Sequence, residues 1–286
     1  MKEKGGRMNA AGQAAGVAPA YVLGHSEREL GRLATQARMV DPMTRRFFQA
    51  AGIVPGMRVL DVGSGPGDVA FLAADLVGDR GEVIGVDRAP AALAVARARA
   101  ESRSLRRVTF LEGDPAEMTF ERPFDAVVGR YVLMFQPDPA AMVRKLATHV
   151  KAGGPIVFHE PDWDGARSFP PAPIYDRCCR WIVETLLFRR HETRMGKKLH
   201  STFVAAGLPA PAMGLDTLIG GGQKGVEGLQ LIADLVETML PAMEDAGVTT
   251  AGEVGLATLA ARMIQEAVAN DSVVVGRYEI GAWSRA

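Results

Sequence analysis

The sequence has 286 residues, 48% of them hydrophobic, and its 33 basic and 33 acidic side chains leave a formal net charge of zero. This length and apolar content suffice for one large domain with a sizeable core, and they exclude a globally disordered chain. The balanced charge argues against a nucleic-acid partner, and no run approaches the ~18 apolar residues of a membrane span.

The first segments along the chain are a tail and a helical region. Residues 1–18 predict a flexible tail rather than a signal peptide, because their middle consists largely of Ala and Gly. Helical spacing begins after Ser26, a candidate N-cap, and a second helix follows Pro42 and ends at Gly52. Residues 19–50 are therefore predicted to form an N-terminal helical segment.

Five short apolar strands follow, and helices separate most of them. The strands are predicted at residues 57–63, 81–87, 107–114, 124–135 and 155–160, and the helices at 68–78, 89–103 and 138–154. Such alternation is typical of right-handed βαβ crossovers and a buried parallel sheet. Residues 51–161 therefore predict the main part of an α/β core.

The regular alternation stops at Pro161. A proline-rich loop and a helical stretch lead to a core helix at 196–208, a sixth strand at 211–222, helices at 226–245 and 252–269, and a seventh strand at 272–285. The resulting prediction is a doubly wound, mostly parallel seven-stranded sheet. Two helical insertions, 162–195 and 223–270, interrupt it and meet over one end of the sheet, while 196–222 and 271–286 return to the core.

Two adjacent cysteines, Cys178 and Cys179, fall in the first insertion. Neighbouring residues seldom form a disulfide, and this pair lacks the spacing of a metal site. We therefore expect both to be reduced and buried in a helix of a cytoplasmic protein. Oligomeric state stays open, with a homo-oligomer among the options.

The stretch "VLDVGSGPGD", residues 59–68, carries most of the chemical information. A nucleoside-triphosphate loop needs a lysine that is missing here. A dinucleotide fingerprint would place Asp68, a negative charge, where a pyrophosphate binds. S-adenosylmethionine (SAM) carries no phosphate, and its methionine part tolerates acidic neighbours.

Within the SAM interpretation the loop residues have distinct roles. Gly63, Gly65 and Gly67, with Ser64 between them, let the backbone approach the ribose and methionine parts of the donor. Asp61, at the end of the first strand, holds the donor's ammonium group directly or through water.

Four motifs in order resemble the class I SAM-dependent methyltransferases. They are "VLDVGSGPGDVA", "VIGVDRAP", "VTFLEGDPAEM" and "FDAVVGRYVLMFQPDPAAMVRKLATHVKAGGPIVFHE", which together span about residues 50–160. The segment "YVLGHSERELGRLATQARMVDPMTRRFF" is also similar to bacterial methyltransferases that act on small natural products. The resemblance implies a Rossmann-like methyltransferase fold and SAM as the cofactor.

The resemblance also implies roles for acidic residues at strand ends. Asp87 closes the second strand and would accept both ribose hydroxyls, its alternative role being a helix N-cap. Arg88 would pack over the adenine edge. Asp114, followed by Pro115, would take the adenine amino group, and the alternative is a simple turn.

Further donor contacts are predicted near the fourth strand. Arg130 and Tyr131 follow "FDAVVG", the first part of this long apolar segment, where an arginine is suited to bind the donor's carboxylate. Gln36, in the N-terminal helical segment, would reach down to the donor, with a solvated helix face as the alternative.

The chemistry itself requires alignment of acceptor, methyl group and sulfur, sometimes with a base. His159 and Glu160 end the fifth strand and are the candidates for contacting or deprotonating the acceptor, the alternative being the polar start of a loop. Tyr21 precedes the first helix, where family members fold a lid over the donor. No cluster has metal-ligand spacing, so we expect no metal.

The resulting hypothesis is methyl transfer from SAM to a small-molecule acceptor, a secondary metabolite, at carbon, nitrogen or oxygen. The alternatives are a non-catalytic SAM-binding protein and an NAD-linked oxidoreductase. A nucleic-acid methyltransferase is disfavoured because "GRYV" stands where its [DNS]-P-P-[YFW] motif would follow the fourth strand.

Overall fold

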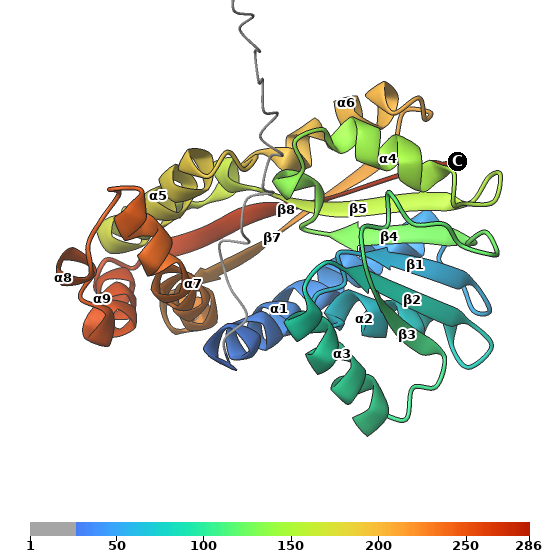
Figure 1. Cartoon of the computed structure of the whole chain (residues 1–286). Helices are drawn as coiled ribbons and strands as arrows, with labels where there is room; N and C mark the ends of the chain where they lie inside the picture. Colours follow the sequence, from blue (N-terminus) through green and yellow to red (C-terminus); the bar gives the residue numbers. More distant parts are fainter. Residues whose placement is uncertain (1–26) are drawn as a thin grey trace, which may run out of the picture.

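The computed structural model of the chain describes residues 27–286 (Figure 1). The predicted tail at 1–18 and the predicted lid residue Tyr21 lie outside the described residues. Among residues 27–286, no helix combines the length and the apolar character needed to cross a membrane.

One sheet of eight strands organises the described residues, in the order β3-β2-β1-β4-β5-β8-β6, with β7 paired to β8. Five strands are parallel: β1 (Arg58–Val62), β2 (Glu82–Asp87), β3 (Val108–Glu112), β4 (Ala126–Arg130) and β5 (Pro155–Asp162). The remaining strands, β6 (Arg167–Phe169), β7 (Ala212–Gly221) and β8 (Val273–Arg285), make antiparallel pairs. The predicted doubly wound α/β fold with a mostly parallel sheet is confirmed.

The strand count and the end of the fourth strand differ from the prediction. The additional strand is β6, which lies in the predicted proline-rich loop and pairs with Val273–Val275 at the start of β8. Three residues are too few to show a strand period in the sequence. The fourth strand ends at Arg130, and a 3-10 turn, η1 (Leu133–Phe135), replaces its predicted second half.

The two faces of the sheet carry separate hydrophobic clusters. Val59 of β1 belongs to the cluster under α2 (Asp68–Val77), α3 (Pro90–Ser102) and the end of the N-terminal helix. The next residue, Leu60, belongs to the cluster on the other face, where α4 (Pro139–Ala147) and α6 (Met195–Ala205) lie. Strand side chains alternate between faces, so a run buried on both sides reads as continuously apolar.

The N-terminal helix corrects the prediction of two helices around Pro42. A single helix, α1 (Glu27–Ala51), runs through the proline. Proline removes one backbone donor and usually breaks a helix interior. Apolar burial on both sides of it offsets this loss, since Val40 is 1% exposed and Met43 and Phe47 are each 5% exposed.

Four helices after β5 gather at the end of the sheet toward which β4 and β5 point, whereas α6 lies beside α4 (Figure 1). They are α5 (Pro173–Phe188), α7 (Val226–Asp245), α8 (Ala251–Val254) and α9 (Leu256–Ala269), with short 3-10 turns η2 (Trp163–Gly165) and η3 (Gly222–Gly225). We call α5 and α7–α9 the helical cap. The helix predicted at 252–269 is interrupted at Gly255, whose φ of 59° is left-handed. Cys178 and Cys179 are buried and free in α5, as expected.

Candidate active site

The glycine loop connects β1 to α2 at the carboxyl end of the sheet. The backbone N–H groups of Gly63 and Ser64 both donate to the carbonyl of Val86, at 2.8 and 3.0 Å. Gly67, with a φ of 93°, then starts α2. The loop is thereby fixed to β2, the neighbouring strand that ends in Asp87.

The glycines of this loop serve two purposes. A Cβ at Gly63 would lie 2.8 Å from Val132, and one at Gly67 would lie 2.9 Å from the rings of Phe71 and Phe110. These two glycines are needed for packing. At Gly65, with a φ of 49°, a Cβ would meet no atom within 4 Å, so this backbone stays open to a ligand.

Two buried polar side chains beside the loop lack partners. Both carboxylate oxygens of Asp61 and the hydroxyl of Ser64 make no hydrogen bond within residues 27–286. Burial raises the pKa of Asp61 well above its ordinary value, Arg130 opposes this, and Asp87 adds to it. Buried polar groups are normally paired, so these orphaned atoms point to a ligand that supplies a donor. An ammonium group fits the carboxylate.

Asp87 lies at the end of β2 and ties the loop to α3. Its Oδ2 accepts from the backbone N–H of Gly65 at 2.8 Å, and its Oδ1 accepts from that of Ala89 at 2.8 Å. It is not the N-cap of α3, since that position belongs to Ala89. A carboxylate has about four acceptor sites, so the two oxygens retain capacity for ribose hydroxyls.

Arg88 and Asp114 form an exposed ion pair between the second and third strand ends. The Oδ1 of Asp114 also accepts from the N–H of Ala116 at 3.0 Å, the geometry of a turn. Pro115 is buried, and its carbonyl accepts from His149 Nε2 at 3.0 Å. The turn predicted as the alternative role of Asp114 is present, and the adenine contacts of these residues remain predictions.

Arg130 joins the end of β4 to α1. Its Nη1 donates to Asp41 at 2.7 Å and to the hydroxyl of Thr44 at 2.9 Å. No hydrogen bond to residues 27–286 uses its Nε or Nη2, so one edge of the guanidinium is left for a carboxylate. Gln36, also on α1, is only 8% exposed and accepts from Arg32, which excludes the solvated helix face proposed as its alternative.

A buried polar network connects three strands. Glu279 of β8 accepts from Arg277 at 2.9 Å, from the Tyr131 hydroxyl at 2.7 Å and from His159 Nε2 at 2.9 Å. Burial raises the pKa of Glu279, but Arg277 and the two other donors outweigh it and hold the pKa at about 2. Glu279 is therefore an anion, and each of its hydrogen bonds is charge-assisted.

His159 lies inside β5 and is fully buried, so it is not the start of a loop. Its Nδ1 lies 3.0 Å from the Thr44 hydroxyl, and its Nε2 faces Glu279. Burial lowers the pKa of His159, although Glu279 opposes the shift. Both ring nitrogens are thus engaged by protein partners in a neutral imidazole.

Glu160, the next residue of β5, is also fully buried and lies inside the strand. Its Oε1 accepts from the N–H groups of Val132 and Leu133, both at 2.8 Å, and its Oε2 from that of Met134 at 3.3 Å. Burial raises its pKa to about 7 against these three donors. The carboxyl therefore holds the turn after β4 and satisfies its free N–H groups.

Four members of the site were missed in the sequence: Asp41, Thr44, Arg277 and Glu279. The last two carried a signal, because they alternate in the otherwise apolar final strand, "VVVGRYEIG", and therefore share one face. Asp41 and Thr44 gave none, since their partners come from strands far along the chain. No group of three or more metal-ligand side chains occurs within the described range, and the metal prediction stays an expectation.

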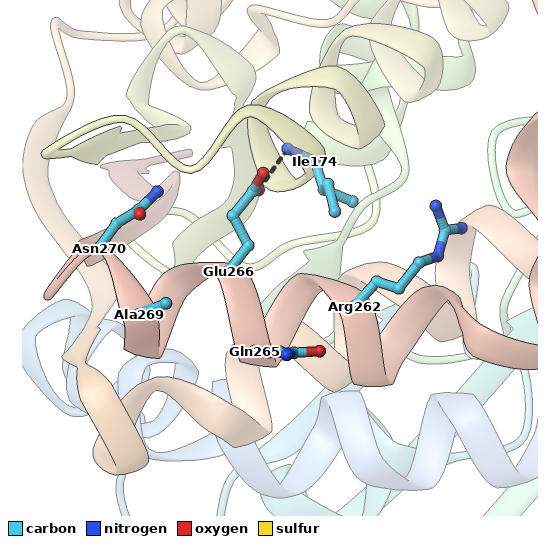
Figure 2. A pocket seen from close by; sticks show the side chains of 6 residues that line it. All are labelled: Ile174, Arg262, Gln265, Glu266, Ala269 and Asn270. Carbon is cyan, nitrogen blue, oxygen red and sulfur yellow. Dashed lines mark hydrogen bonds between the residues drawn. The ribbon is translucent and has the colours of Figure 1, made fainter.

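A surface hollow of about 420 Å³ on the cap does not belong to this site. It is bounded by Ile174 at the start of α5, by side chains of α9 such as Arg262, and by Asn270, the C-cap residue of that helix (Figure 2). Glu266 accepts there from the N–H of Ile174 at 2.7 Å. None of its lining residues has a buried polar atom without a hydrogen-bond partner, and none of the predicted site residues lines it.

Comparison with known proteins decides the family. Residues 53–207, more than half of the chain, match the methyltransferase domain family. The chain belongs to this family. The predicted membership of the class I SAM-dependent methyltransferases is confirmed, and SAM is the donor of that family.

Curated relatives of the chain are named for small-molecule substrates. The aklanonic acid methyltransferase DauC of a Streptomyces strain is 38% identical over 133 residues, 46% of this chain and 60% of the relative. The 2-phytyl-1,4-naphtoquinone methyltransferase of Synechococcus elongatus is 42% identical over 134 residues, 45% of this chain and 56% of the relative. The chain thus spans somewhat over half the length of these relatives.

Solved structures support the α/β fold over most of the chain. Geranyl diphosphate C-methyltransferase from Streptomyces coelicolor superposes with a TM-score of 0.55 at 16% identity, covering 93% of this chain and 87% of that chain. A Bacillus halodurans methyltransferase structure gives a TM-score of 0.53 at 21% identity, with coverages of 84% of this chain and 96% of that chain.

Asp68 was the sequence argument against a dinucleotide. It pairs with Arg99 at 2.6 Å, so its repulsion of a pyrophosphate is weaker than predicted. The family match, rather than Asp68, disfavours the oxidoreductase.

Proposed function

We propose that this protein transfers the methyl group of SAM to a small-molecule acceptor. The observation that carries the proposal is the pair of orphaned oxygens of Asp61 beside the open backbone at Gly65. An ammonium group satisfies the first, and a ligand edge lying against the backbone occupies the second. Bound SAM supplies an electrophilic methyl group on a sulfonium.

The donor is held, in this proposal, by residues of four elements. Asp61 takes the ammonium group, the free edge of Arg130 takes the carboxylate, and Asp87 accepts the ribose hydroxyls. Asp114 with Pro115, and Arg88 beside them, border the adenine. Tyr131 and Gln36 flank the methionine part from β4 and α1, and Tyr21 stays a predicted lid contact.

Positioning, rather than a protein base, is the main contribution we assign to the fifth strand. The sequence indicates His159 and Glu160 as acceptor contacts or bases, but their hydrogen-bonding atoms already serve Thr44, Glu279 and the turn at Val132. We propose that these two residues fix the Tyr131 turn beside which the acceptor meets the methyl group of the donor. Alignment of the reacting atoms supplies much of the rate enhancement in such a site.

The acceptor is proposed to be a secondary metabolite. The relative named for aklanonic acid supports this class. In this proposal the segments 162–195 and 223–270 enclose the acceptor. We place the reaction in the cytoplasm, which fits two free cysteines.

Donor binding tests the proposal directly. SAM should raise the melting temperature of the protein at saturating concentration, and NADH should not, because a ligand that binds only the folded state stabilises it. Asp61→Asn should reduce the rise in melting temperature caused by SAM, since a neutral amide cannot form an ion pair with an ammonium group. A shift with NADH alone would favour the oxidoreductase, and SAM binding without turnover on any acceptor would favour a non-catalytic binder.

A further inference from the structure

A second cavity lies where the core sheet meets the helical cap. Its volume is about 200 Å³, and it is enclosed by α1, β7, α7 and β8, with Tyr175 contributed by α5. Its walls are mainly apolar, and Val40, Leu231 and Ile232 are each at most 8% exposed. Pockets of drug-sized ligands are roughly 300–1,000 Å³, so this one suits a compact molecule.

One cation inside the cavity keeps a free donor. The Arg277 side chain is 13% exposed, its Nε donates to Glu279, and its Nη2 donates to the Tyr131 hydroxyl at 2.9 Å. Within residues 27–286 no hydrogen bond uses Nη1, and that atom is not among the buried unpartnered ones, so it stays accessible. The guanidinium is also held over the rings of Tyr131 and Trp163, at 4.9 and 5.2 Å.

The anion beside this cation is already satisfied. Glu279 lines the same cavity, but its two oxygens receive donors from Arg277, Tyr131 and His159. The two other charged residues of the lining, Lys224 and Glu227, are exposed and lie at its rim. The polar function that the interior offers to a ligand is therefore a fixed cationic donor.

The cavity lies near the glycine loop, and the turn at Tyr131 and Val132 contacts both. Val132 approaches Gly63 so closely that a Cβ there would lie 2.8 Å away, and the preceding residue, Tyr131, bonds to the cavity residues Arg277 and Glu279. On the other side, Met39 of α1 lines the cavity two residues before Asp41, which pairs with Arg130.

We propose that this cavity is the acceptor site, and that Arg277 binds an anionic oxygen, a carboxylate or an enolate, on a compact and otherwise apolar acceptor. This inference rests on the proposed methyl transfer and adds the chemical class of the acceptor. A planar guanidinium pairs with such oxygens through charge-assisted hydrogen bonds, and apolar walls bind the rest of the molecule.

Calorimetry with two probes of the same shape tests the proposal, in the presence of saturating S-adenosylhomocysteine. The probes are 2-naphthoate, an anion, and 2-naphthamide, its neutral counterpart. The wild-type protein should bind 2-naphthoate about 10–100-fold more tightly, the ratio expected for a hydrogen bond to a charged group. Arg277→Met should remove this preference.

A helix glycine gives a second variant that leaves the charge network intact. Gly228 of α7 lines the cavity, and a Cβ there meets no atom within 4 Å, so Gly228→Phe places a ring in the space without displacing the backbone. It should abolish binding of both probes. Gly252→Phe, at an equally open glycine of α8 away from the cavity, is the matched control and should bind both probes normally.

The outcomes separate this inference from the proposed function. If S-adenosylhomocysteine itself fails to bind, the proposed function is wrong. If it binds, but 2-naphthoate does not, or shows no preference over the amide, or still binds to Gly228→Phe, the acceptor assignment is overturned.

Discussion

At the scale of single residues, Asp87 is the side chain with the most direct consequence for the donor. Each charge-assisted hydrogen bond contributes about 1.5–3 kcal/mol, and in the proposed complex this carboxylate makes two with ribose while it accepts from the N–H of Gly65. Asp87→Ala should therefore weaken SAM binding about 100-fold or more by calorimetry. Arg122→Ala, an exposed change at the amino end of the sheet, should leave the dissociation constant unchanged. A normal dissociation constant in Asp87→Ala would remove the ribose role.

The residues of the site divide into those that the sequence locates and those that it cannot. Asp61 and Asp87 lie at the ends of neighbouring strands and Gly65 lies in the loop that follows the first of them, so chain order alone brings them to one edge of the sheet. The partners of Glu160 are backbone N–H groups of a turn, which no side-chain pattern announces. Its predicted contact with the acceptor followed from position alone, and its burial appears only in three dimensions.

At the scale of elements, Glu160 couples β5 to the turn η1 and makes stability depend on pH. Burial raises its pKa from an ordinary 4.5 to about 7, so the folded state binds more protons than the unfolded state between these values. The free energy of unfolding should therefore fall as pH rises through that window, by about 3 kcal/mol for a shift of this size.

Glu160→Gln should remove this dependence and still fold. The amide oxygen can accept from Val132 and Leu133 as Oε1 does, and only the 3.3 Å contact with Met134 is lost. Urea unfolding at pH 5 and pH 8 measures the difference for each protein. Equal pH dependence in the two would mean that Glu160 is ionised in the folded state at pH 5.

The predictions of helices and strands succeeded where a periodic apolar pattern extends over many residues, and they failed where packing overrides local preference. α7 has the predicted bounds, 226–245, although Pro241 lies inside it, because ten of its residues are buried. Pro42 likewise lies within α1, where the burial of Val40 and Phe48 keeps the helix continuous. A local signal reports propensity, whereas these helices are stabilised by contacts with distant strands.

At the scale of the whole molecule, strand β8 joins the core to the cap. It pairs with β5 along eight residues, with β7 on its other side and with β6 near its start, and its first half runs between α5 and α7 of the cap (Figure 1). One hydrophobic cluster contains Leu60 and Ile156 of the parallel sheet together with Leu229 and Met263 of the cap. The cap insertions interrupt the sequence of the core without forming a hydrophobic core of their own.

This continuity predicts that core and cap unfold together. The chain has three tryptophans, of which Trp181 reports on α5 in the cap and Trp283 on β8 beside β5. The test uses two variants, each of which keeps only one of these two tryptophans and carries Phe at the other tryptophan positions. In each variant, the urea transition followed by fluorescence should coincide with the loss of helical circular dichroism. Coincident probes are the mark of a two-state transition, and a shared cluster gives neither part a stable state alone. The contrary result is a Trp181 fluorescence signal that is lost at a lower urea concentration than the circular dichroism of the same variant, while the Trp283 variant still gives its native fluorescence at that concentration. The cap would then be a separately folding unit that closes over the acceptor cavity.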